Sequence, residues 1–88
     1  MYSYKTLENI ELEVIYNTFV EAFSDYQVKF DISFYNFQIM MKRRGLNLEF
    51  SMGTFKDGKM VGFILNGVRE WNGKITIYDV GTGFLIYD

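Results

Sequence analysis

Two turn dipeptides between apolar runs most strongly limit how this chain can fold. Asp57-Gly58 and Asn72-Gly73 are both typical of two-residue hairpin turns, because a type I′ turn requires positive φ at both central residues. The runs around them have the apolar pattern of strands, which we expect at Leu46–Met52, from Met60 through Leu65, and at Lys74–Thr82. The sequence therefore predicts an antiparallel meander in the second half of the chain.

The first half of the chain predicts one short strand and two helices. Alternation over Tyr2–Thr6 indicates the strand. A helical stripe begins at about Asn9 and consists of Leu12, Ile15, Tyr16, Phe19, Ala22, Phe23 and Tyr26. The second helix is expected to start at the capping residue Ser33 and to end at a left-handed Gly45. Its buried stripe is expected to be Phe34, Phe37, Met40 and Met41.

These elements give the order β-α-α-β-β-β in a single domain, residues 1–88. We expect an α+β fold, an α/β layer unit in which two helices cover the meander of strands two to four. Glycines inside the third strand, Gly62 and Gly67, predict a bulge or a close approach of another group.

Composition excludes several classes of function. A net charge of −2 is unlike a general nucleic-acid binder, which needs a basic face. The chain has no Cys for thiolate chemistry and no His for an imidazole base or an ordinary zinc site. The start of the chain lacks the pattern of a signal peptide, and no apolar run approaches a membrane span. We therefore expect a cytoplasmic protein without metal, nucleic acid or membrane partners.

The order of elements resembles the N-terminal half of the GNAT acetyltransferase superfamily. The resemblance covers nearly the whole chain. Its stretches are Glu21-Ala22-Phe23-Ser24-Asp25-Tyr26, Arg43-Arg44-Gly45, Ser51-Met52-Gly53, Met60-Val61-Gly62-Phe63-Ile64-Leu65-Asn66-Gly67, Asn72-Gly73-Lys74, Tyr78 and Gly81-Thr82-Gly83.

The resemblance implies acetyl transfer from acetyl-CoA to an amine. In the family, amides around a bulge in the fourth strand polarise the acetyl carbonyl and hold the pantetheine arm. By this resemblance the cofactor-facing residues are Gly81, Thr82, Gly83 and Phe84. The loop residues Ser24, Asp25 and Tyr26 are similar to part of the acceptor-binding wall.

The sequence departs from the family after the fourth strand. The family places a loop of the type Arg/Gln-x-x-Gly-x-Gly/Ala there, whose amides bind the coenzyme pyrophosphate. Here the chain continues as Phe84-Leu85-Ile86-Tyr87-Asp88 and stops. We therefore expect a truncated, acceptor-side half that has no cofactor of its own and is not catalytic alone. A natural stop, a frameshift and an artificial boundary all remain open.

Candidate side chains for chemistry favour structural roles. Glu49, Glu70 and Asp79 are interpreted as surface or cross-strand charges, because nothing in the spacing pairs them with another titratable group. The run Lys42-Arg43-Arg44 is interpreted as a solvated helix end rather than a phosphate site. Four methionines are expected to fill the core: Met40, Met41, Met52 and Met60.

The tail Phe84–Tyr87 continues a strand whose outer edge has no predicted neighbour. Such an edge is a template for pairing, and we expect a homodimer through strand four and this tail. Two alternatives stay open. The chain is half of a split acetyltransferase that another polypeptide completes, or it is a small non-enzymatic module that binds a ligand or a protein.

Overall fold

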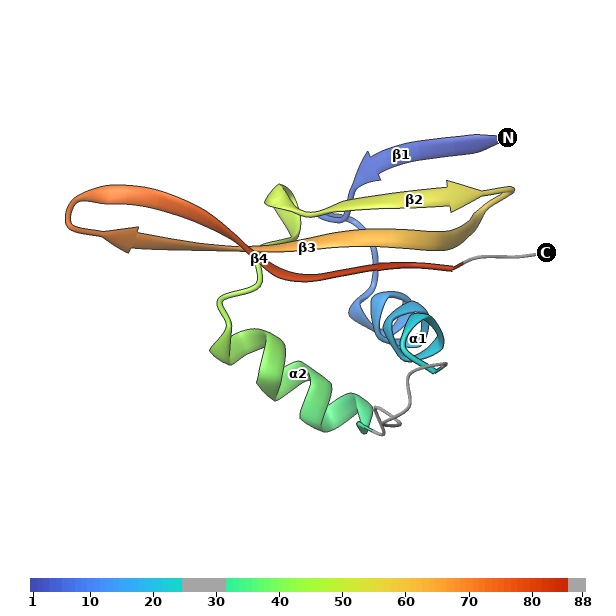
Figure 1. Ribbon diagram of the computed structural model, residues 1–88, viewed down its shortest axis with the longest axis horizontal. Coiled ribbons are helices and arrows are strands. Elements are labelled where there is room, and N and C mark those ends of the chain that lie inside the picture. The colour runs from blue at the N-terminus through green and yellow to red at the C-terminus, as the bar shows by residue number, and fades with distance from the viewer. Residues whose placement is uncertain (25–31, 86–88) are drawn as a thin grey trace.

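The computed structural model describes residues 1–24 and 32–85, and these residues form an α+β fold (Figure 1). Four strands form one antiparallel sheet with neighbours in the order β1-β2-β3-β4. The predicted β-α-α-β-β-β order is confirmed. The elements are β1 (Tyr2–Thr6), α1 (Leu12–Ala22), α2 (Phe34–Arg43), the short 3₁₀ helix η1 (Leu48–Phe50), β2 (Met52–Lys56), β3 (Lys59–Trp71) and β4 (Lys74–Phe84).

Both predicted hairpin turns are confirmed. Asp57 and Gly58 have φ values of 51° and 86°, and Asn72 and Gly73 have 51° and 77°. Positive φ at both central positions is the type I′ geometry, whose twist matches that of the flanking strands. The second turn joins the long strands β3 and β4, whose tips reach past the helices (Figure 1).

The second helix begins and ends as predicted. The Ser33 hydroxyl oxygen accepts a hydrogen bond from the Asn36 amide at 3.1 Å, and Gly45 after the helix has a φ of 75°. The first helix starts at Leu12 and not near Asn9. The reason is that Leu7 is fully buried and its amide bonds to the Ser51 carbonyl, so the chain must turn before the helix can start.

The prediction of a strand over Leu46–Met52 is wrong in its first part. Leu46 makes only an isolated bridge to Gly67, and η1 follows. The Asn47 side-chain oxygen accepts a hydrogen bond from the Glu49 amide at 2.9 Å, which favours a turn over an extended chain. Strand alternation would point these polar side chains toward solvent, whereas in the structure they bind the backbone.

The core lies between the sheet and the helices. Phe19 of α1 stacks on Phe63 of β3 at 5.9 Å between ring centroids and contacts Phe37 of α2 at 5.1 Å. The buried core residues are Leu7, Ile15, Phe19, Phe37, Met41, Phe55, Met60, Phe63, Leu65 and Val80. Four residues of the predicted helical stripes therefore lie in this core, namely Ile15, Phe19, Phe37 and Met41, whereas Tyr26 of the first stripe lies outside the described residues.

The opposite side of the sheet, which we name the open face, is not covered by any described element. Directly paired residues share a face, and two rows cross all four strands: Tyr4, Thr54, Gly62, Phe84, and Thr6, Met52, Ile64, Thr82. Large apolar side chains are exposed along it: Tyr2, Tyr4, Met52, Ile64, Ile75, Ile77 and Phe84. Met52 is 40% exposed, so the prediction that it fills the core is wrong, whereas Met41 and Met60 are buried.

Candidate functional site

A β-bulge interrupts β4 at the segment that the resemblance assigns to the cofactor. Leu65 of β3 pairs with Gly81 and Asn66 pairs with Asp79, so Val80 is an extra residue on β4. Val80 is buried in the core, and a Cβ on Gly81 would lie 3.7 Å from the Phe19 ring. Both bulge residues therefore face the helices.

The Asp79 carboxylate stabilises this bulge. Its Oδ1 atom accepts hydrogen bonds from the Gly81 amide and from the Thr82 hydroxyl, each at 3.1 Å. Asp79 also shares the open face with Asn66, its partner on β3. The interpretation of Asp79 as a plain surface charge is thus incomplete, because it organises the backbone that follows it.

The four residues predicted to face a cofactor divide between the two sides of the sheet. Gly81 and Gly83 face α1, and a Cβ on Gly83 would lie 2.6 Å from the Phe63 ring and 3.1 Å from Ala22. Thr82 and Phe84 lie on the open face, where the Phe84 ring covers Gly62. Close packing therefore explains the glycine at position 83 without a ligand.

Thr82 and Phe84 line a cavity of about 330 Å³ on the open face. Tyr4, Met52 and Ile64 complete its exposed apolar wall. Because its walls are mostly apolar, this cavity suits an apolar group rather than a charged one.

Of the three predicted acceptor-binding residues, only Ser24 is described. It follows α1, and its hydroxyl donates a hydrogen bond to the Glu21 carbonyl at 2.7 Å. Asp25 and Tyr26 lie outside the described residues. The end of α1 lies close to β4, since a Cβ added to Gly83 would lie against the Ala22 side chain. The fold thus brings the start of the predicted acceptor loop toward the predicted cofactor strand.

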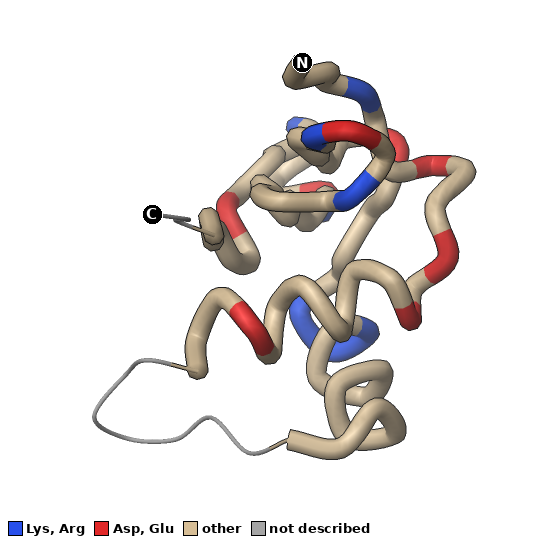
Figure 2. Tube along the Cα trace, turned by 90° about the vertical axis from the view of Figure 1, so that its right-hand side faces the viewer, with Lys and Arg blue, Asp and Glu red and all other residues tan. Residues whose placement is uncertain are grey.

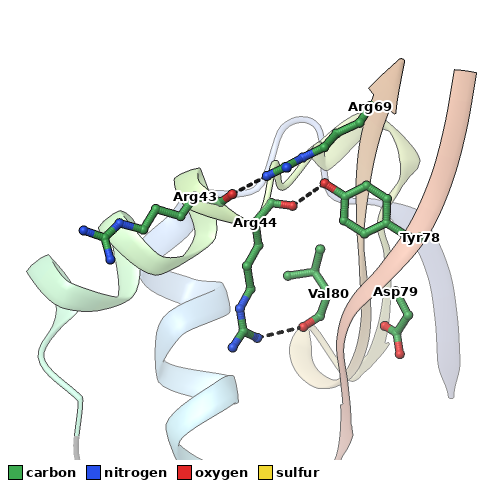
Figure 3. A pocket seen from close by; sticks show the side chains of 6 residues that line it. All are labelled: Arg43, Arg44, Arg69, Tyr78, Asp79 and Val80. Atoms are coloured by element: carbon green, nitrogen blue, oxygen red, sulfur yellow. Dashed lines mark hydrogen bonds between the residues drawn. The ribbon is translucent and has the colours of Figure 1, made fainter. Parts of the chain in front are cut away.

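A second cavity, of about 390 Å³, lies where α2 ends against β3 and β4 (Figure 3). We name it the arginine cavity after three of its lining residues; the full lining is Arg43, Arg44, Arg69, Tyr78, Asp79 and Val80. The sequence indicated the basic run at the end of α2, which Figure 2 shows as a continuous blue segment. It did not indicate that Arg69 of β3 joins it.

Three hydrogen bonds to backbone carbonyls build this cavity. Arg69 donates to the Arg43 carbonyl, Tyr78 donates to the Arg44 carbonyl at 2.5 Å, and Arg44 donates to the Val80 carbonyl at 3.2 Å. The first two satisfy carbonyls at the end of α2 that no helical amide can reach. The third ties the same helix end to the bulge.

The remaining candidate groups form no catalytic cluster. Glu49 lies in η1 and Glu70 near the tip of β3, and both are exposed. No three metal-binding side chains gather anywhere in residues 1–24 and 32–85. Among the described helices, none has the length and apolarity to cross a membrane.

The described residues thus form a small α+β protein. Helices cover one face of its sheet, and a bulge interrupts the edge strand β4. Comparison with protein-family models, curated proteins and solved structures found no match.

Proposed function

We propose that this chain is the acceptor-side half of a GNAT-type acetyltransferase unit, and that it is not catalytic alone. The order of elements, the antiparallel sheet and the placement of both helices on one face support the proposal. The family reaction transfers an acetyl group from acetyl-CoA to an amine. The 88 residues contain no Arg/Gln-x-x-Gly-x-Gly/Ala motif, so the pyrophosphate would require residues from elsewhere.

The bulge at Val80 and Gly81 is the observation that carries the proposal. A bulge redirects backbone N–H groups, and such groups can polarise a carbonyl when they point at the oxygen that gains charge. The Gly81 amide already donates to Asp79. The acyl carbonyl would therefore be held by an amide farther along β4, between Thr82 and Phe84.

S-acetylpantetheine tests this assignment, because it carries the reactive arm of acetyl-CoA without the pyrophosphate. We expect weak, saturable shifts of the Thr82 and Gly83 amide resonances when it is added to the ¹⁵N-labelled chain. Adenosine 3′,5′-bisphosphate is the control, and it should leave these amides unchanged. Saturation at other residues alone, or none at all, would contradict the proposal. No acetyl transfer to amines is expected from the chain by itself.

The second part of the proposal is that two copies associate through β4. This strand is last in the sheet order, so its outer edge has no strand partner among the described residues. Unpaired N–H and C=O groups along an edge of 11 residues form a template for a further strand. A two-fold copy would pair β4 with β4 and continue the antiparallel sheet.

Sedimentation velocity over a range of concentrations tests this association. We expect a monomer–dimer equilibrium, with amide hydrogen exchange along the outer edge of β4 slower at high concentration. Exchange at the edge of β1 should not change with concentration, which provides an internal control. A monomer at the highest concentration would remove this part of the proposal and leave the first part standing.

A second candidate function, a protein-interaction module, is favoured by the open face. Its exposed apolar side chains lie side by side across four strands, and monomeric proteins rarely expose large continuous apolar patches. In this case binding would shift resonances of Tyr4 and Ile64 and leave the outer edge of β4 open to exchange. The hydrogen-exchange experiment therefore separates the two candidates.

A further inference from the structure

The arginine cavity has a charge that its surroundings do not balance. Within residues 1–24 and 32–85, no ion pair joins Arg43, Arg44 or Arg69 to a carboxylate. The hydrogen bonds of Arg44 and Arg69 go to neutral backbone carbonyls. A guanidinium has five N–H donors, so most donors of both groups remain for a ligand or for water.

The one carboxylate that lines the cavity is already engaged. Asp79 accepts two hydrogen bonds at the bulge, from Gly81 and Thr82. In Figure 3 its carboxylate is turned away from the Arg44 guanidinium. It therefore lowers the positive potential of the cavity without pairing with an arginine.

The sum of nearby charges remains positive. Three arginines and one carboxylate belong to the lining residues, and the C-terminal end of α2 adds about half a negative charge. An excess of about one and a half positive charges is left, in a chain whose net charge is −2. This local sign reversal favours an anion that carries more than one charge.

The residues around the cavity are held in place before any ligand arrives. Tyr78 lies against Gly45 and Gly67, where a Cβ would come within 2.5 Å of its hydroxyl or ring. The Arg69 guanidinium lies over the Tyr78 ring at 5.9 Å from its centroid. Fixed donors lose less entropy when they bind a ligand than free surface side chains do.

We propose that the arginine cavity binds a small dianionic oxyanion, a phosphate monoester or free phosphate, through Arg44 and Arg69. The volume of about 390 Å³ is at the lower end of the range for small-molecule sites. In Figure 3 the Arg43 guanidinium points away from Tyr78 and Val80, so it contributes charge and not a direct contact. The site does not depend on the acetyltransferase proposal, because it uses no residue from Thr82 to Phe84.

Titration with inorganic phosphate at constant ionic strength tests the proposal, with the full chain observed by NMR. We expect saturable shifts of the Arg44 and Arg69 Nε–H resonances and of the Val80 amide. Arg44→Gln and Arg69→Gln should each weaken binding about tenfold or more, as the loss of a charge-assisted hydrogen bond predicts. Acetate, with one charge, should bind at least several-fold more weakly than phosphate.

Lys74→Gln is the matched control, because it removes the same charge at the tip of the β3–β4 hairpin, away from the cavity. It should leave phosphate affinity within about twofold, since exposed distant charges are screened by salt. Arg44→Lys keeps the charge and checks that a loss in Arg44→Gln is not unfolding. The proposal would be overturned if phosphate binding did not saturate, or if Lys74→Gln lost as much phosphate affinity as the arginine variants. It would also be overturned if acetate bound as tightly as phosphate. The titration with S-acetylpantetheine follows the resonances of different residues, so the two proposals can fail separately.

Discussion

At the scale of single residues, the two glycines Gly81, in the bulge, and Gly83, after it, differ in the side chains that they would tolerate. A Cβ on Gly83 would meet the Phe63 ring at 2.6 Å, a distance that requires the core to move. A Cβ on Gly81 would lie 3.7 Å from Phe19, which is an ordinary contact. Neither residue has a positive φ, so backbone strain does not separate them.

Gly83→Ala is expected to lower the free energy of unfolding by about 1–3 kcal/mol, as overpacking of a close-packed core does. Gly81→Ala is the matched control, and it should leave stability unchanged or raise it by about 0.5 kcal/mol, because glycine is costly inside a strand. Urea unfolding followed by tryptophan fluorescence and circular dichroism measures both. Equal effects of the two substitutions would contradict the packing assigned to Gly83.

Local signals in the sequence were sufficient where one residue determines its own conformation. The turns at Asp57-Gly58 and Asn72-Gly73 and the cap at Ser33 are such cases, and all are confirmed. The need for glycine at position 83 depends on Phe63 and Ala22, which no local pattern relates to it. The meeting of Arg69 with the end of α2 is likewise tertiary. This is why the sequence indicated the candidate strand and missed the arginine cavity.

At the scale of elements, the end of α2 and the β3–β4 hairpin act as one unit. Side chains of both strands donate to the last helical carbonyls, and Arg44 donates back to Val80 in the bulge. The alternation of apolar residues could not reveal this contact between the end of α2 and the hairpin. The segment that joins α2 to the sheet, Leu46–Phe50, forms no strand. The polar contacts of Asn47 and Ser51 hold that connection in place.

Tyr78→Phe tests the link between helix and hairpin. It removes the hydroxyl that donates to the Arg44 carbonyl and keeps the ring between Gly45 and Gly67. We expect a loss of about 0.5–1.5 kcal/mol in thermal or urea unfolding, the usual net value of one hydrogen bond. Tyr35→Phe on α2, where the ring is 71% exposed, should change stability by less than about 0.5 kcal/mol. A similar loss in both variants would contradict the assignment.

At the scale of the whole molecule, both faces of the sheet carry apolar side chains, and the helices cover only one of these faces. The helices bury Phe63 and Leu65, while Ile64 between them is 48% exposed. Strand alternation predicts that neighbours on β3 point to opposite faces. It cannot say which face a helix covers, and β3 is apolar on both.

Under the interaction-module candidate, Ile64→Thr is expected to weaken association through the open face and to change stability by about 1 kcal/mol or less, since the side chain is half exposed. Threonine keeps the β-branch that favours a strand. Val14→Thr makes the same kind of polar change on the exposed side of α1 and should leave association unchanged. Light scattering at increasing concentration compares the two. Unchanged association in Ile64→Thr would leave β4 pairing as the source of any dimer.

The pairing of β1 with β2 has a consequence for the order in which the chain folds. The Met1 amino group meets the Asp57 carboxylate, a residue 56 positions away, whereas both hairpins close over two-residue turns. Closing a long loop costs more entropy and slows the formation of the contacts that depend on it. We therefore expect the hairpins to form first and β1 to dock last. By the same reasoning β1 is the strand that detaches first, so its amides should exchange through local opening while β3 stays protected.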